Sequence, residues 1–150
     1  MDEIHVIGGK CLHGNITVQG SKNTVLPLMA GALLYRGINV LKACPRITDV
    51  FYMEEILRAL GAETWWEDHD LYLDCTHADG SHVPEIYSGR MRSSIILLGP
   101  ILARNQQAEI GYPGGCVIGK RPVDLHLYVL RRFGAEIKEE EKKITVSCKK

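Results

Sequence analysis

The chain has 150 residues, of which 45% are hydrophobic and 24% charged, and its 18 basic and 18 acidic side chains give a formal net charge of +0. A chain of this length can bury roughly 68–70% of its unfolded surface, so we expect a folded globular protein rather than a disordered one. The balanced charge argues against a nucleic-acid binder, which usually carries a basic excess. The five cysteines form no Cys-x-x-Cys pair, which disfavours a zinc site or a disulfide framework.

The most apolar stretches of the sequence are too short to cross a bilayer, for which about 20 residues are needed. Residues 25–34 and 95–103 are about half that length, so we expect them in the core. The acidic start Met-Asp-Glu shows neither a secretory signal nor a transit peptide. We therefore predict a cytoplasmic protein without a membrane partner.

The chain repeats itself after a short leading segment. The heptapeptide LRALGAE that begins at Leu57 returns as LRRFGAE at Leu130, and the strand pattern that ends in Cys75 returns at Cys148, both at an offset of 73 residues. An upstream apolar segment returns at an offset of 69, so a short insertion falls inside the second copy. Self-similarity at a fixed period indicates repeated structural units. We predict a leading hairpin and two repeat units, with bounds 1–19, 20–78 and 79–150.

Each unit is predicted to contain the same elements in the same order. The first is a helix that is apolar on nearly all sides, which must be buried by its neighbours. A strand, an amphipathic helix ended by glycine, and two further strands follow. These elements are expected at 23–34, 38–41, 50–60, 63–67 and 71–74 in the first unit, and at 93–104, 108–112, 127–133, 136–139 and 143–147 in the second. The hairpin is expected from strands at 4–7 and 15–19. The pattern predicts an α/β fold with helices inside and sheets around them.

The two connections that lead into the amphipathic helices differ in kind. The first, residues 42–49, is an ordinary loop, whereas the second, residues 112–125 (YPGGCVIGKRPVDL), places Cys116 among three glycines. Lys120 and Arg121 follow, just before the helix begins. Nearby cations and a helix N-terminus lower the pKa of a thiol and raise its thiolate fraction. Cys116 is therefore a candidate catalytic residue, and the alternative is an inert small apolar residue in a turn.

The same loop is close to the phosphate-binding pattern G-x-x-x-x-G-K-[ST], since Gly114, Gly119 and Lys120 fit it between a strand and a helix. Arg121 occupies the position of the hydroxyl that binds Mg²⁺, and Pro122 prevents a shift of the pattern by one residue. A nucleotide-hydrolase loop is therefore disfavoured. An anion site without a metal stays open, because a helix N-terminus attracts phosphate by itself.

A second cationic place opens the first apolar helix at Lys22 and Asn23, where an ammonium beside an amide could hold a carboxylate or a phosphate. The alternative is a solvated lysine at a helix start. Arg92 opens the second apolar helix at nearly the equivalent position. The repeat therefore predicts that Lys22 and Arg92 lie at the same end of two parallel inner helices, on one face with Arg121. We expect a local positive pocket for a small polyanion there.

Three segments resemble the family of UDP-N-acetylglucosamine enolpyruvyltransferases, also called 1-carboxyvinyltransferases. They are Lys22-Asn23, Met91-Arg92 and, above all, the motif PGGCxIGxRPVDLH at residues 113–126. The likeness runs from about residue 4 to the end of the sequence. It implies the inside-out α/β repeat fold of the enolpyruvyltransferase type, with two of its six repeat units present and a leading hairpin that belongs to the other lobe.

The resemblance also implies an activity. The family transfers the enolpyruvyl group of phosphoenolpyruvate to the 3-hydroxyl of UDP-N-acetylglucosamine and releases phosphate, which is the first committed step of bacterial peptidoglycan synthesis. It implies no metal and no organic cofactor. The partners are the two small-molecule substrates, with neither a nucleic acid nor a membrane among them.

Residue by residue, the resemblance implies that Cys116 is catalytic, as a proton donor to the enol carbon, as the site of a covalent phosphoenolpyruvate adduct and as the target of fosfomycin. It implies phosphoenolpyruvate binding by Lys22, Asn23 and Arg121. For UDP-N-acetylglucosamine it implies Arg92, Arg121, Pro122, Val123, Asp124 and Leu125.

The chain departs from the family in its length. In the family the second lobe supplies an aspartate that acts as the base on the sugar hydroxyl, and a further arginine, so the resemblance implies half of an active site here. One alternative is a catalytically silent fragment that associates with itself or with a complementing C-terminal piece. Another is a metal-independent phosphate-binding module built on the glycine loop.

Overall fold

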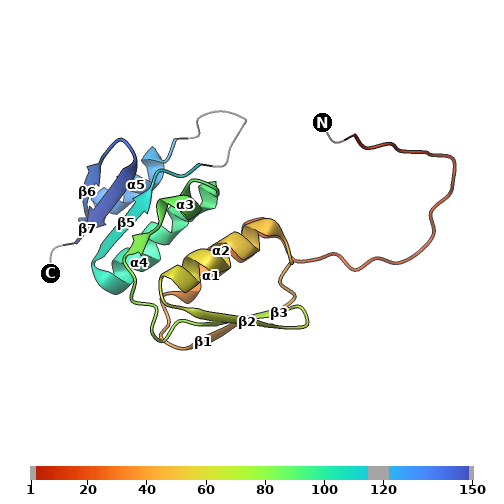
Figure 1. Ribbon diagram of the computed structural model, residues 1–150, viewed down its shortest axis with the longest axis horizontal. Coiled ribbons are helices and arrows are strands. Elements are labelled where there is room, and N and C mark those ends of the chain that lie inside the picture. The colour runs from red at the N-terminus through yellow and green to blue at the C-terminus, as the bar shows by residue number, and fades with distance from the viewer. Residues whose placement is uncertain (1–2, 115–121, 149–150) are drawn as a thin grey trace.

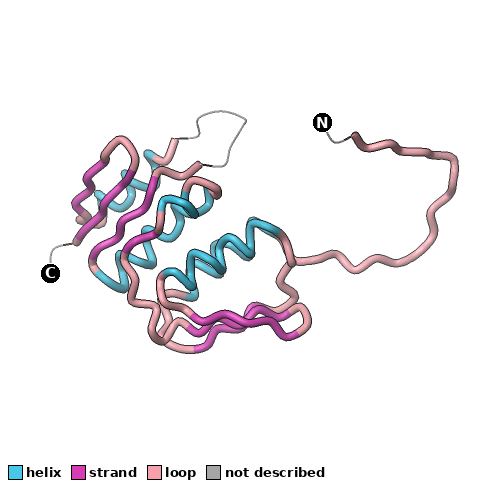
Figure 2. Tube along the Cα trace, in the orientation of Figure 1, coloured by secondary structure: helices cyan, strands magenta, loops and turns pink. Residues whose placement is uncertain are grey.

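Two small sheets, each backed by helices, form the body of the computed structural model of this chain (Figures 1 and 2). The structure describes residues 3–114 and 122–148. Its helices are α1 (Lys22–Ala32), α2 (Thr48–Ala59), α3 (Glu85–Ser88), the 3₁₀ helix η1 (Arg92–Leu97), α4 (Leu98–Asn105) and α5 (Asp124–Arg132). Its strands are β1 (Ile38–Leu41), β2 (Glu63–Glu67), β3 (Asp70–Asp74), β4 (His82–Val83), β5 (Gln107–Gly111), β6 (Glu136–Glu139) and β7 (Lys143–Ser147).

The two sheets repeat one strand order. The first is β1-β3-β2, antiparallel throughout, and the second contains β5-β7-β6 in the same arrangement, with β4 added parallel to β5. The register agrees with the sequence offsets, because Val40 pairs with Tyr72 in the first sheet and Glu109 pairs with Thr145 in the second. The α/β repeat architecture expected from the sequence is therefore observed, whereas the unit bounds at 20–78 and 79–150 stay a prediction.

A buried arginine joins the two repeats. Arg104 of α4 is only 4% exposed. Its guanidinium donates hydrogen bonds to carbonyl oxygens of Leu33 (2.7 Å), Cys75 (2.5 Å) and Thr76 (3.1 Å). These carbonyls lie just after α1 and β3, where regular backbone hydrogen bonding stops and acceptors need other partners. A cation of the second repeat thus satisfies backbone acceptors of the first.

The second inner helix differs from the single helix predicted at 93–104. It consists of η1 followed by α4, and Pro100 lies in the first turn of α4. A proline is tolerated in a first turn because its missing N–H has no partner there, whereas further inside a continuous helix it removes a hydrogen bond. Pro100 therefore favours a new helix start near Leu98. The short elements β4 and α3 were not predicted, since neither is long enough to show a period.

The leading hairpin predicted at 1–19 is not observed in the described residues. Residues 3–20 contain no strand, and Figure 2 shows this segment as a loop that runs away from the body. Its apolar side chains are almost fully exposed, as for Ile7 (97%) and Ile16 (91%). An isolated two-stranded hairpin is at best marginally stable in water, and no part of the chain that the structure describes covers these side chains to support one.

The inner helices are buried on one side only. Met29 of α1 is fully buried, but Leu28 and Leu34 are 52% and 62% exposed. Phe133, expected on the apolar face of the second amphipathic helix, is 84% exposed, although Leu127 on that helix is buried. The prediction of burial on all sides was wrong for Leu28 and Leu34, and the burial expected for the apolar face of the amphipathic helix was wrong for Phe133, because no described residue covers them.

Candidate functional site

Lys22 begins α1 and forms an ion pair with Asp49 in the first turn of α2, with 3.2 Å between Nζ and Oδ1. Both side chains are partly exposed, and Asn23 beside them is exposed as well. Figure 1 shows that α1 and α2 begin at the same end of the first unit. Helix N-termini carry positive partial charge, so this end adds two helix ends to the ammonium of Lys22 and is suited to an anion.

Arg92 begins η1 in the second unit and contacts the segment that leads into α5. Its guanidinium donates a hydrogen bond to the carbonyl oxygen of Pro122 at 3.1 Å. The side chain is half-buried between these elements. This contact holds Pro122, two residues before α5 begins, next to the start of η1.

A second arginine connects this place with the first unit. The guanidinium of Arg90 lies 5.9 Å from the ring centre of Tyr52 in α2, a distance typical of a cation–π contact. Tyr52 is three residues after Asp49, hence on the same face of α2. Contacts therefore run from Lys22 through Asp49 and Tyr52 of α2 to Arg90, which lies two residues before Arg92 in the sequence. That Lys22 and Arg92 share one face stays a prediction. Sequence reasoning missed Arg90 because its partner belongs to the other repeat.

Three predicted site residues lie outside the described part of the chain: Cys116, Lys120 and Arg121. One neighbouring end of that segment is held at the end of α3 and the other at the start of η1. The N–H of Gly114 donates a hydrogen bond to the carbonyl oxygen of Ser88 at 3.1 Å, and a Cβ at Gly114 would overlap the backbone of Gly89. On the other side, Pro122 accepts the hydrogen bond from Arg92. The two ends are thus bound to residues 88 and 92, which flank Arg90 in the sequence.

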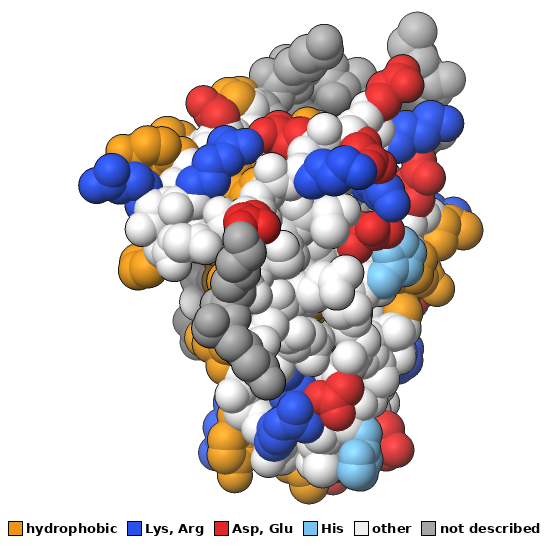
Figure 3. Space-filling model, turned by 90° about the vertical axis from the view of Figure 1, so that its left-hand side faces the viewer, with side chains coloured by type: hydrophobic (Ala, Val, Ile, Leu, Met, Phe, Trp, Pro, Cys, Tyr) orange, Lys and Arg blue, Asp and Glu red, His pale blue; other side chains and the backbone are white. Residues whose placement is uncertain are grey.

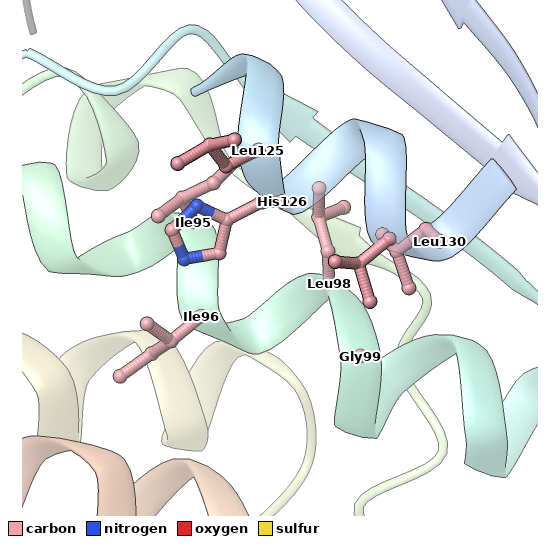
Figure 4. Close-up of a pocket in the computed structure, with 8 residues that line it drawn as sticks. Ile95, Ile96, Leu98, Gly99, Leu125, His126 and Leu130 are labelled. Atoms are coloured by element: carbon pink, nitrogen blue, oxygen red, sulfur yellow. The ribbon is translucent and has the colours of Figure 1, made fainter. Parts of the chain in front are cut away.

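The residues predicted to hold the nucleotide sugar surround the start of α5. Val123 precedes the helix and is half-buried, Asp124 lies in its first turn, and Leu125 is 72% exposed. Leu125 and His126 border a largely apolar groove of about 390 Å³ between α5 and the η1–α4 segment, and in Figure 4 Leu125 lies above Ile95 while the His126 ring lies beside it. The sequence did not predict this groove, since its walls come from separate segments that only the fold brings together.

The other cysteines have surroundings unlike those expected for Cys116. Cys44 is buried, and burial together with the charge of Glu54 raises the pKa of its thiol to about 11. Burial also raises the pKa of Cys75. Cys11 is exposed and Cys148 half-buried, and all four are free thiols. A raised pKa leaves little thiolate at neutral pH, so Cys44 and Cys75 are unsuited to nucleophilic or acid–base chemistry.

Two further properties concern residues 3–114 and 122–148. Within these ranges, no three or more His, Cys, Asp and Glu side chains are grouped so that they could hold a metal ion. None of the helices there is long and apolar enough to cross a membrane. The described residues that could bind a ligand include cationic side chains, helix N-termini and an apolar groove.

Comparison with known proteins identifies the family. The family model of EPSP synthase (3-phosphoshikimate 1-carboxyvinyltransferase) matches residues 6–150. The chain belongs to this family. It is 42% identical over 139 residues to UDP-N-acetylglucosamine 1-carboxyvinyltransferase 2 of Caldanaerobacter subterraneus subsp. tengcongensis, which covers 93% of this chain and 33% of that protein. The crystal structure of the enolpyruvyl transferase NikO from Streptomyces tendae matches with a TM-score of 0.80 at 23% identity, over 95% of this chain and 32% of that one.

These matches confirm two predictions made from the sequence. The resemblance based on the motif at 113–126 is confirmed at the level of the family, and the enolpyruvyltransferase type of α/β fold is confirmed by the structural match. This member of the EPSP synthase family spans about one third of the length of both relatives. The roles of the individual site residues stay predictions.

Proposed function

We propose that this chain supplies one half of the active site of an enolpyruvyltransferase, which transfers the enolpyruvyl group from phosphoenolpyruvate to the 3-hydroxyl of UDP-N-acetylglucosamine and releases phosphate. The observation that carries the proposal is the 3.1 Å hydrogen bond from Arg92 to Pro122. This hydrogen bond joins Arg92, at the start of the second inner helix, to Pro122, which follows Cys116 by six residues in the sequence. The name of the relative that is 42% identical supports the choice of substrates.

The reaction replaces one oxygen substituent on phosphoenolpyruvate by another. The sugar O3 bonds to C2 while C3 gains a proton, and then the bond between C2 and the phosphate oxygen breaks while C3 loses a proton, which restores the double bond. We assign the proton delivered to C3 to the thiol of Cys116. A group that gives and takes this proton needs a pKa tuned by its neighbours, and Lys120 and Arg121 are the adjacent cations in the sequence. The hydroxyl proton goes to the aspartate of the other lobe.

The remaining site residues bind and orient the two substrates. Lys22, Asn23 and Arg121 are assigned to the carboxylate and phosphate of phosphoenolpyruvate. Cations placed where charge develops stabilise the transition state more than the ground state. The ion pair with Asp49 holds Lys22 at the start of α1 until the more highly charged substrate arrives.

The nucleotide sugar is assigned to the start of α5. Arg92 and Arg121 supply cations, and Pro122, Val123, Asp124 and Leu125 supply the backbone and side chains at the rim of the apolar groove. Val123 is half-buried and held by its neighbours, whereas Leu125 is exposed and accessible to a ligand, so both offer apolar surface there.

A second function, association without catalysis, is favoured by the exposed apolar faces at Leu28, Leu34 and Phe133. In this alternative the chain binds a complementing C-terminal piece, or itself, through those faces. Sedimentation of the chain alone and mixed with the C-terminal two thirds of the Caldanaerobacter relative distinguishes the two partners. A third function, phosphate binding by the glycine loop alone, predicts a thermal shift with ATP as large as the shift with UDP-N-acetylglucosamine.

A chimera tests the proposed reaction. This chain replaces the matching third of the Caldanaerobacter relative, and phosphate release is measured with both substrates. We expect release that saturates in phosphoenolpyruvate and in UDP-N-acetylglucosamine, and that disappears in the chimera with Cys116→Ala. A folded chimera that releases no phosphate, or one that is indifferent to Cys116→Ala, contradicts the proposal.

A further inference from the structure

The outer face of the first sheet carries an exposed aromatic row. Helices α1 and α2 lie on one side of β1-β3-β2, and in Figure 1 no other labelled element covers the opposite side. On that opposite face, Val40, Tyr72 and Trp65 are direct neighbours across the three strands. The rings of Trp65 and Tyr72 stack at 5.1 Å with 15° between their planes. Large apolar side chains on a solvated sheet face are the exception, since such faces are usually polar.

The second sheet is an internal control for this face. Its equivalent row consists of Glu109, Thr145 and Lys138, which the register places side by side. These side chains are polar and their charges are paired, as between Glu109 and Lys143 at 3.0 Å. Figure 3 shows basic and acidic side chains next to one another on the side of the molecule that it presents. The fold therefore does not require aromatic side chains at this place, and those of the first sheet need another explanation.

Four carboxylates flank the aromatic row. Along β3 the outward residues alternate as Asp70, Tyr72 and Asp74, and on β2 Glu67 pairs with Asp70 while Glu63 pairs with Asp74. Among the described residues, no Lys, Arg or His approaches any of these four carboxylates within the 4.0 Å of an ion pair. Glu109 of the second sheet is paired with a cation, whereas, within the described ranges, Asp70, Asp74 and Glu67 of the first accept hydrogen bonds only from neutral donors, such as the N–H of Ala43 and the side chains of Thr76 and Trp65.

The sign of this charge selects the partner. The carboxylates of this face repel nucleic-acid phosphates and anionic lipid surfaces. They also disfavour the same face of a second copy of the chain, which would bring its own carboxylates against them. Stacked indole and phenol rings attract arginine and lysine, and carboxylates bind the same two side chains. Side chains on one face of a strand recur every second residue, so Asp70, Tyr72 and Asp74 match an extended segment with cations at alternate positions. We propose that this outer face binds an extended, arginine- or lysine-rich segment of a partner protein.

Titration with a designed peptide tests this proposal. A fluorescently labelled peptide of four Arg-Thr repeats is titrated with the purified 150-residue chain, and its anisotropy is followed at low and at high salt. We expect saturable binding that weakens as salt increases, because exposed charge pairs are screened. The peptide of four Glu-Thr repeats should not bind.

Variants locate the binding on the face. Trp65→Lys with Tyr72→Thr installs the residues of the second sheet, and we expect it to weaken binding about tenfold or more. Glu63→Gln with Glu67→Gln keeps the rings and removes two charges, and should weaken binding and its salt dependence. Lys138→Thr on the second sheet is the matched control and should change neither. Circular dichroism verifies the fold of each variant, and the glutamine pair decides the question if the aromatic pair does not fold.

Three results would overturn the proposal. They are an intact chain that does not bind the arginine peptide, binding that both variant pairs leave unchanged, and equal binding of the glutamate peptide. Displacement of the peptide by a neutral oligosaccharide, with binding of that sugar independent of salt, would assign the aromatic row to carbohydrate instead. None of these results depends on phosphate release, so the outcome is independent of the proposed reaction.

Discussion

The connections that lead into α2 and into α5 occupy equivalent places in the two repeats, and each contains a cysteine. In the first, Cys44 is buried and its N–H donates a hydrogen bond to the carbonyl oxygen of His69 at 2.7 Å. The preceding N–H, of Ala43, donates to Asp70 at 2.9 Å. These two hydrogen bonds hold the connection against the β2–β3 turn. Burial and the charge of Glu54 raise the pKa of the Cys44 thiol to about 11.

The second connection is longer and is held by hydrogen bonds near each of its ends. Gly114 is bound to Ser88 and Pro122 to Arg92, and Cys116 follows two glycines between these points. The comparison shows that the two repeats differ in a loop rather than in the strand order of their sheets. This difference is why we propose that the second repeat carries the chemistry and the first serves as scaffold. Function resides in such loops because a packed element tolerates fewer changes.

The largest effect is expected for the chain assayed alone, without the rest of a family member. We predict no phosphate release above a Cys116→Ala blank. Loss of a general base costs about 10²–10⁴ in rate, and loss of the second lobe also removes the positioning that accounts for roughly 7–11 kcal/mol at its limit. Saturable release by the isolated chain would show that its own residues complete the site.

Glu54→Gln tests the scaffold role of the first repeat. The carboxylate of Glu54 is 2% exposed and accepts hydrogen bonds from Arg58, Thr64 and Trp66. Removing its charge should lower the free energy of unfolding by about 2–3 kcal/mol, since hydrogen bonds to charged groups are the stronger ones. Urea denaturation measures the loss. Glu55→Gln on the same helix is the control and should change stability little.

Gly114→Ala tests the anchor at the start of the Cys116 segment. The new Cβ would overlap the backbone of Gly89, so we expect a loss of about 1–2 kcal/mol in unfolding free energy. In the chimera the same change should lower kcat/KM by displacing Cys116. Gly99→Ala places its Cβ in open space within α4 and should be neutral or slightly stabilising. Equal effects of the two substitutions would argue against a tight contact at Gly114.

The smallest effect concerns acid stability of the second sheet. Hydrogen bonding to Lys143, with the charges of Lys143 and His82, holds the pKa of Glu109 below its ordinary value. A lowered folded-state pKa stabilises the protein above the unfolded pKa, and this contribution is lost as pH falls through the folded pKa. Stability should therefore decline on acidification below about pH 4, and less so in Glu109→Gln. Unfolding curves between neutral and acid pH that are parallel for both proteins would contradict this.

Much of the fold could be predicted from local pattern. The strands at 38–41, 63–67, 136–139 and 143–147 have the bounds that alternation predicted. Gly61 and Gly134 end their helices with φ of 99° and 89°, a backbone conformation for which glycine is the usual choice. Alternation also predicted a hairpin before residue 20, and failed there because a strand needs a partner surface that the pattern does not reveal.

The candidate site could be predicted only in part. The repeat offset placed Lys22 and Arg92 at equivalent helix starts, and the family motif singled out residues 113–126. Arg90 with Tyr52, and the groove beside Leu125, depend on contacts between distant segments. Local patterns contain no information on such contacts, so these features could not be found before the fold was known.

Competitive thiol labelling tests the central claim, that the glycine-rich connection carries the reactive group. The folded chain is treated with limiting iodoacetamide, and peptide mapping follows each cysteine over time. We expect Cys116 to be labelled first, ahead of the exposed Cys11, while Cys44 and Cys75 react only after unfolding, because a thiolate beside cations reacts fastest and a buried thiol is inert. Labelling of Cys11 or Cys44 before Cys116 would contradict the account.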